Sequence, residues 1–297
     1  MKGERFTRHD KSHVDDVIMT AGRMLGIGSD AITPAFRSLE PYEVFALLLA
    51  ILLHDAGNAS GREGHERRAA TIIQELGTTA DLEQAEKRLI ASIARAHGGR
   101  TPAGDKDTIS HLPRRAEIIH VPVHAQRLAA VLRLADEFSE NPRRADEGAL
   151  REGSGAPPES IIHNLYCKTI NISFDYVGHT IKTEYEVEKP NLSRQFQADS
   201  NPASSILLID YIRERLEKGE LERRYCNRFL NGFVTYDRIS VTLDVTHDDE
   251  IIDKIGFYLE DSGYPTSGVD WATVASRLDG ASLRDHLIPS VPQDDQS

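Results

Sequence analysis

An unbroken run of ten apolar residues, from Val44 to Leu53, limits the folds open to this chain more than any other segment. Pro41 suits the first turn of a helix and Gly57 suits its end, so the run predicts a helix that is buried on all sides. The run ends directly at His54 and Asp55. A helix that crosses a membrane needs about 20 apolar residues. We therefore expect the run to form part of a protein core, without a membrane segment.

Four further helices are predicted in the N-terminal half, where apolar residues recur at helical spacing. Ser12 and Asp15 have the spacing of a capping box, which places His13 at the start of the first helix. Gly26 and Gly28 are expected to end that helix. The other three helices are expected over these ranges: Gly64 to Leu76, Asp81 to Ala96 with His97 after it, and Pro122 to Asp136.

The composition and the hydrophobic period both change after residue 138. Residues 139–160 are rich in Pro, Gly, Ser and charge, which is typical of a linker or a mobile loop. Beyond them, apolar and polar residues alternate as they do in strands. We therefore predict an α+β fold with four parts: an all-α domain at 1–146, a linker at 147–160, a smaller α+β domain at 161–288 and a disordered tail at 289–297.

The predicted α+β domain begins with a hairpin, because two alternating segments flank a turn at Val177, Gly178 and His179. A helix from Ser204 to about Leu230 is expected to break near Gly219. The remaining elements are expected in this order: a strand from Ile239 to Val245, a helix over 251–259 and a helix over 271–278.

Charge and cysteine content restrict the function classes. The chain has a formal net charge of −12 and 6% aromatic residues, so a basic groove with stacking rings for nucleic acid is not expected. A nucleotide is easier to accommodate than a duplex. Cys167 and Cys226 have no CxxC spacing, so neither a disulfide framework nor a thiolate zinc site is expected. The charged N-terminus lacks the apolar stretch of a secretory signal, which favours the cytoplasm.

Of three His-Asp dipeptides, only His54-Asp55 lies at the end of a buried apolar helix. The negative end of the helix dipole and burial both disfavour a carboxylate there, so Asp55 needs a nearby cation. Asp136 lies at the end of another apolar helix and has the same need. A metal ion would satisfy both carboxylates. An ion pair between Asp136 and Arg133 is an equally reasonable explanation for Asp136.

The histidines are weak signals when each is taken alone. His97 is also typical of the last turn of a helix, His65 of an exposed first turn, and His13 of the edge of an apolar stripe. Their order along the chain is more specific than any one of them. A histidine at a helix start precedes a buried His-Asp pair, and two more histidines precede an aspartate that ends an apolar helix.

This order resembles the HD superfamily of metal-dependent phosphohydrolases. The segments that carry the resemblance lie within residues 6–146 and are FTRHDKSHVDDVI, LLAILLHDAGN, GHERRAA, IARAHGG and LAAVLRLADEF. They are most similar to an HD-CE-like subgroup that is often predicted to act in bacterial conflict systems. The region after residue 160 resembles no family that we can name.

The resemblance implies a metal site with one or two divalent ions. It assigns His13, His54, Asp55 and Asp136 to a first ion, and His65 and His97 to a second. Imidazole and carboxylate ligands suit Mn, Fe, Co, Ni or Zn better than Mg. Asp55 would bridge the two ions, which share an activated water. The other candidates are His9 as a proton donor and three arginines for phosphate oxygens: Arg67, Arg143 and Arg144.

Three functions remain open on the sequence alone. The first is hydrolysis of a phosphoester in a nucleotide or a nucleotide-like small molecule. The second is a binding or signalling module that contacts a partner protein, or a second copy of the chain, through residues 161–288. The third is a metal nuclease for single strands, which the net charge of −12 disfavours.

Overall fold

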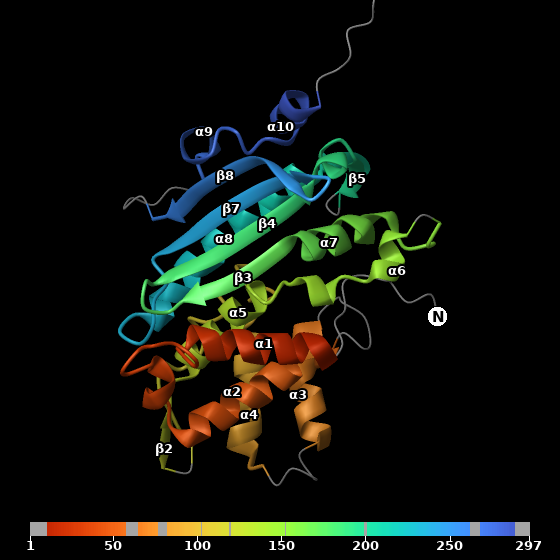
Figure 1. Ribbon diagram of the computed structural model, residues 1–297. Coiled ribbons are helices and arrows are strands. Elements are labelled where there is room, and N and C mark those ends of the chain that lie inside the picture. Colours follow the sequence, from red (N-terminus) through yellow and green to blue (C-terminus); the bar gives the residue numbers. More distant parts are fainter. Residues whose placement is uncertain are drawn as a thin grey trace, which may run out of the picture.

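The structure of the chain is a computed structural model that describes eight segments: residues 11–57, 65–76, 82–101, 103–118, 120–151, 153–198, 201–261 and 268–288. The fold is α+β, as predicted. In Figure 1 a group of helices lies below a β-sheet and the helices that accompany it. The predicted tail at 289–297 lies outside the described residues.

The lower group contains the five helices that the apolar periodicity predicts. Their bounds are α1 Lys11–Met24, α2 Pro41–His54, α3 His65–Leu76, α4 Gln84–Arg95 and α5 Ala125–Glu137. Gly26 and Gly28 follow α1 with φ of +82° each, a conformation that glycine adopts without strain. Capping boxes begin α2 at Glu40 and α4 at Glu83, so paired side-chain and main-chain bonds define both helix starts.

The ten-residue apolar run predicts that α2 is buried on all sides, and this prediction is wrong. Ala46, Ala50 and Ile51 are fully buried, but Phe45, Leu48 and Leu52 are 39–53% exposed. The exposed residues are spaced by three and four positions, so they share one face of the helix. That face meets solvent because α1, α4 and α5 pack on the other sides of α2.

The sequence predicts that α5 begins at Pro122, and this prediction is wrong. Pro122 lies in a two-stranded antiparallel ribbon of β1 (Ala116–Ile118) and β2 (Val121–Val123), where it pairs with Glu117. A proline is compatible with an edge strand because its missing N–H can face away from the partner strand. Helix α5 begins three residues later, at Ala125.

The central sheet has four strands in the order β3-β4-β7-β8. The predicted hairpin is confirmed as β3 (Ile170–Asp175) and β4 (Thr180–Glu188), and the predicted third strand as β7 (Arg238–His247). Strand β7 runs parallel to β4, with Ile181 opposite Ile239. The prediction of a helix over 251–259 is wrong. This segment belongs to β8 (Glu250–Glu260), which pairs antiparallel with β7.

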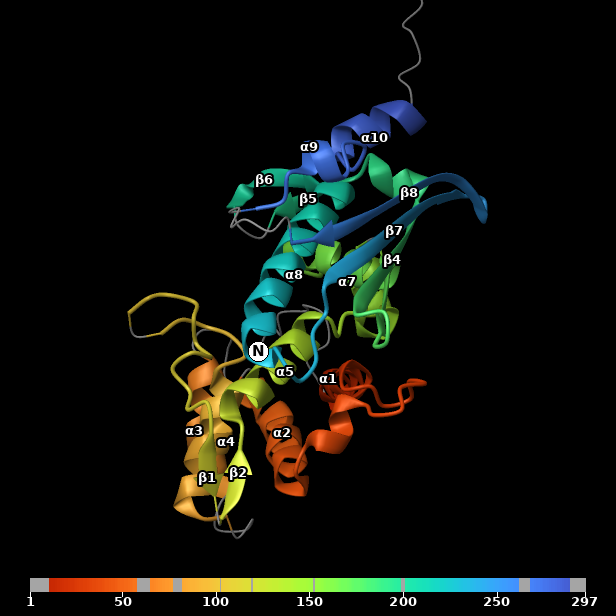
Figure 2. The ribbon, with the colours of Figure 1, turned by 90° about the vertical axis from the view of Figure 1, so that its left-hand side faces the viewer.

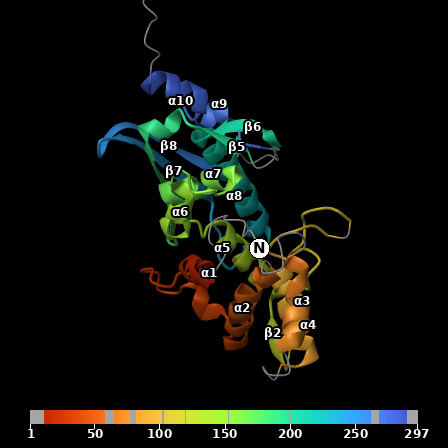
Figure 3. The ribbon, with the colours of Figure 1, turned by 90° about the vertical axis from the view of Figure 1, so that its right-hand side faces the viewer.

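One long helix, α8 (Leu208–Leu230), covers the buried face of the sheet. The predicted break at Gly219 does not occur. A Cβ atom on Gly219 would lie 3.1 Å from Cζ of Phe138, so glycine lets α8 approach the end of α5 closely. Figure 2 shows α8 running from the sheet down to α5, and Figure 3 shows the same arrangement from the other side.

The remaining elements pack around the sheet and α8. They are the 3-10 turns η1 (Ala35–Ser38), η3 (Pro142–Arg144) and η4 (Lys189–Leu192), the helices α6 (Glu147–Leu150), α7 (Pro158–Thr169), α9 (Trp271–Val274) and α10 (Gly280–Leu287), and the hairpin of β5 (Gln195–Ala198) and β6 (Asn201–Leu207). The sequence does not predict this hairpin. The helix predicted over 271–278 is shorter, and α10 follows it.

Both halves share one hydrophobic core, which extends from α1 to α10. Helices α5 and α8 form the main contact between the halves. The segment predicted as a linker, 147–160, contains α6 and the start of α7, and Ala149 within it is buried. Among the described residues, no helix is both long enough and apolar enough to cross a membrane.

Candidate metal centre

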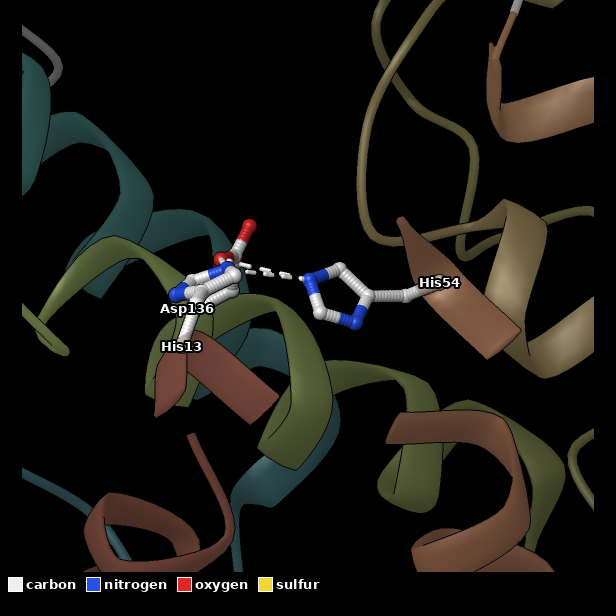
Figure 4. A group of neighbouring side chains, drawn as sticks. All are labelled: His13, His54 and Asp136. Carbon is white, nitrogen blue, oxygen red and sulfur yellow. Dashed lines mark hydrogen bonds and ion pairs between the residues drawn. The ribbon is translucent and has the colours of Figure 1, made fainter. Parts of the chain in front are cut away.

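Three helices bring His13, His54 and Asp136 to one point. His13 lies in the first turn of α1, His54 is the last residue of α2, and Asp136 lies in the last turn of α5. Nε2 of His13 is 3.2 Å from Oδ1 of Asp136, and Nε2 of His54 is 3.5 Å from the same oxygen. The two imidazole nitrogens are 3.3 Å apart. Figure 4 shows the rings of both histidines directed at Asp136, and one potential ligand atom from each residue lies within 4.8 Å of the others.

Asp55 and His97 extend this cluster on a second side. Oδ2 of Asp55 lies 3.6 Å from Nε2 of His13 and 3.7 Å from Nε2 of His54. Its other oxygen, Oδ1, lies 3.8 Å from Nε2 of His97. Asp55 therefore presents one oxygen to the first group and the other oxygen to His97, which is the arrangement of a bridging carboxylate.

Main-chain carbonyl groups orient two of the imidazole rings. Nδ1 of His54 donates to the carbonyl oxygen of Ile51 over 2.7 Å, and Nδ1 of His97 donates to that of Ala94 over 2.6 Å. A carbonyl only accepts, so Nδ1 carries a proton, and when the ring is neutral its Nε2 presents a lone pair to the cluster. Histidine ligands of metals are commonly held in this way.

The electrostatics of the cluster favour a positive charge at its centre. Burial alone would lower the pKa of His54, but the hydrogen bond and charge of Asp136, with the charge of Asp55, raise it to about 9. Burial would raise the pKa of Asp136, but His13 and His54 hold it well below its usual range. Burial and the charge of His54 lower the pKa of His97. The cluster thus keeps the Asp136 carboxylate ionised and favours the charged form of His54.

Arg133 does not neutralise Asp136, which was the alternative explanation for that carboxylate. Nε and Nη2 of Arg133 donate to the two oxygens of Glu222, over 2.6 and 2.8 Å. Asp136 interacts with His13 and His54 instead. With 28% of its side chain exposed, Asp136 is also the part of the cluster that solvent reaches most readily, since the Asp55 side chain is 15% exposed.

The donor set fits a divalent transition-metal ion. Three imidazole nitrogens and two carboxylates converge, and two rings have their lone pairs directed inward by carbonyl bonds. His13, His54, Asp55 and Asp136 are placed to hold one ion, while His97 and the second oxygen of Asp55 are placed to contact another. This is the division of ligands that the resemblance implies, apart from His65.

Some predicted site residues cannot be compared with the structure. His9 lies outside the described residues, as do the side chains of His65 and Arg67. The backbone at position 65 begins α3.

The two arginines predicted to bind substrate phosphate are engaged within the protein. Arg143 donates to the buried carboxylate of Asp16, and its own side chain is 68% exposed. Arg144 is 2% exposed and forms an ion pair of 3.3 Å with Glu140. Arg144 therefore does not face solvent in this conformation. Arg143 lies at the surface, where it is accessible.

The sequence analysis missed Asp16 and Asn141. Asp16 lies one turn after His13 and is 4% exposed. It accepts a hydrogen bond of 2.8 Å from Nδ2 of Asn141 and the ion pair from Arg143, so it links α1 to the chain that follows Asp136. Both partners of Asp16 lie more than 100 residues away along the chain, so no local pattern in the sequence indicates this link.

The fold and the site together define an α+β protein whose helical half carries a histidine and carboxylate cluster suited to divalent cations. The chain belongs to the HD-CE family, whose family model matches residues 3–218. The match covers every residue of the cluster and continues through α7 and the sheet strands β3 and β4 into α8. The comparison with curated proteins gave no match.

Proposed function

We propose that this chain is a metal-dependent phosphohydrolase that cleaves a phosphoester of a nucleotide or a nucleotide-like small molecule. The observation that carries the proposal is the convergence of His13, His54, Asp55, His97 and Asp136 at ligand spacing. The order of these residues resembles that of the HD superfamily. Membership of the HD-CE family is consistent with that assignment.

The proposed reaction needs no nucleophile from the protein. A bound divalent ion supplies an acidified water and a positive charge for a phosphate oxygen. The chain's own residues fix the geometry. The carbonyls of Ile51 and Ala94 orient His54 and His97, while Asp136 keeps a negative charge that would help to hold the ion.

A small substrate suits the charge of the chain better than a polymer does. At a net charge of −12, the long-range field repels a nucleic-acid backbone. A single phosphoester needs only local positive charge, which a bound metal ion would supply. The alternative functions, a binding module and a single-strand nuclease, differ from the proposal in measurable ways.

The test combines metal analysis with a substrate screen. The full chain is purified without added metal, its metal content is measured, and it is then assayed with Mn²⁺, Co²⁺ and Ni²⁺ against nucleotides, cyclic nucleotides and single-stranded oligonucleotides. We expect turnover of a small phosphoester that falls by at least about 10-fold in the His54→Ala variant, since even loss of a residue that only supports a metal ligand costs about 10- to 100-fold.

A second His-Asp dipeptide provides the matched control. His247 and Asp248 form the same dipeptide at the end of β7, where Nε2 of His247 is 3.7 Å from Asp248 and its side chain is 49% exposed. The His247→Ala variant should keep full activity and metal content. Metal binding without any turnover would support the binding module instead, and turnover of oligonucleotides alone would support the nuclease.

A further inference from the structure

A cavity of about 290 Å³ lies beside the metal centre, where the chain leaves α4. The loop that forms its outer wall projects between α4 and β1, to the left in Figure 2. Ala96 and Gly98 line the cavity, but His97 between them directs its side chain to Asp55 in the metal cluster. The cavity is therefore a separate space from the cluster, although it shares the same stretch of backbone.

The polar residues of this cavity are two arginines, a histidine and three residues with hydroxyl groups. They are Arg95, Arg100, His111, Ser92, Thr101 and Thr108. No aspartate or glutamate is among the described residues that line it. The chain has a net charge of −12, but the wall of this cavity has two arginines, a histidine and no carboxylate. The charge beside the cavity is therefore opposite in sign to that of the whole chain.

The cationic side chains are not neutralised by ion pairs within the described part of the chain. Arg95 is exposed and forms no ion pair there, and neither does His111. Arg100 donates to the carbonyl oxygen of Gly104 over 2.6 Å, which uses one of its five N–H groups and leaves its charge uncompensated. Asp107, the nearest acidic residue in sequence to Thr108, bonds Tyr225 and Arg228 instead.

We propose that this cavity binds the phosphate group of a small phosphorylated ligand, at a site distinct from the metal centre. Arg95, Arg100 and His111 contact the phosphate oxygens, since guanidinium groups match phosphate geometry. Ala96 and Leu112 form an apolar wall that suits the organic part of the ligand.

The test uses the full chain after removal of metal with EDTA, so that phosphate cannot bind at the metal centre. Inorganic phosphate and ribose 5-phosphate are titrated separately by calorimetry, in a buffer without other multivalent anions. We expect binding of at least one of them. Tighter binding of ribose 5-phosphate identifies a phosphorylated organic ligand, and equal binding identifies free phosphate, because both probes share the phosphate group.

One variant and one control make the test specific. Arg95→Gln removes a charge at the cavity, and Arg88→Gln removes the same charge from an exposed position two turns earlier on α4, outside the cavity. Arg95→Gln should weaken binding by about tenfold or more, as loss of a charge-assisted hydrogen bond does. Arg88→Gln should bind as the wild type does.

The proposal is overturned if neither probe binds the wild type, or if Arg88→Gln weakens binding as much as Arg95→Gln does. Because the protein is free of metal, these outcomes do not depend on its hydrolytic activity.

Discussion

Arg133 of α5 and Glu222 of α8 form a bidentate ion pair whose side chains are only 7% and 14% exposed. The two nitrogens of Arg133 lie 2.6 and 2.8 Å from the two carboxylate oxygens. Arg133 precedes Asp136 by one helical turn, so the pair anchors the helix that carries a candidate metal ligand to the main helix of the second half.

Removal of one partner of this pair should destabilise the protein strongly. Glu222→Leu leaves a largely buried guanidinium without its carboxylate, which costs about 3 kcal/mol in the free energy of unfolding. Urea denaturation measures the change. The control is Lys182→Ala, because Lys182 pairs with Asp175 at the surface and should cost less than about 1 kcal/mol. Similar losses of free energy in both variants would show that the pair between α5 and α8 stabilises the protein no more than a surface ion pair does.

Removal of bound metal should lower the melting temperature, and the whole effect should depend on the residues of the metal cluster. An ion that binds only the folded chain, at 100 times its dissociation constant, adds about 2.7 kcal/mol. We therefore expect Mn²⁺ to raise the melting temperature of EDTA-treated protein by about 5 °C. Asp136→Asn should remove this rise, and Asp248→Asn should keep it. A rise of equal size in both variants would place the bound metal elsewhere in the chain.

The pH dependence of stability should include a contribution from Glu140. Burial would raise the pKa of Glu140, but the charges of Arg144 and Arg215 lower it below its ordinary value of 4.5. A lowered pKa means that the ionised group stabilises the folded state above pH 4.5, and that this stabilisation is lost as the pH falls through the folded-state value.

The variant Glu140→Gln isolates this contribution. At pH 6, in EDTA, its free energy of unfolding should lie about 3 kcal/mol below that of the wild type, because Arg144 loses its partner. The difference should shrink as the pH falls below 4.5. A difference that stays constant between pH 6 and pH 3.5 would mean that the charge of Glu140 does not contribute.

The exposed face of α2 should tolerate truncation, unlike the buried face. Ile51 is fully buried and Leu52 is 53% exposed, although the two residues are adjacent in one apolar run. Ile51→Ala should cost about 3 kcal/mol in the free energy of unfolding, and Leu52→Ala less than about 1 kcal/mol. Chemical denaturation of the two variants is the measurement. Equal costs would mean that another part of the protein covers Leu52 in solution.

Local signals in the sequence predict most of the fold correctly. Strong apolar periods identify α1 to α5, the β3–β4 hairpin and β7. The errors occur where tertiary packing outweighs local preference. Glycine costs about 1 kcal/mol within a helix, yet α8 continues through Gly219 because the missing side chain lets it pack against Phe138. The segment 251–259 forms a strand because β7 offers it an edge to pair with.

The sequence predicts which residues form the candidate site, but it does not predict how they are arranged in space. His13, His54 and Asp136 each lie at a helix end, and this position next to an apolar run is what marks them as candidates in the sequence. Their convergence depends on how three helices cross, which no local pattern contains. The role of Asp16 was missed for the same reason, since its partners Asn141 and Arg143 are more than 100 residues away in the chain.

The parallel pairing of β4 with β7 has a consequence for synthesis on the ribosome. Strand β4 leaves the ribosome well before β7, because the whole of η4, β5, β6 and α8 lies between them. At the usual 5–20 residues per second, β4 waits roughly 2 to 10 s with one edge unpaired. During that interval the nascent hairpin exposes Ile181 and Tyr185 to the cell, so the time when this chain is most prone to aggregate falls before its last strands are made.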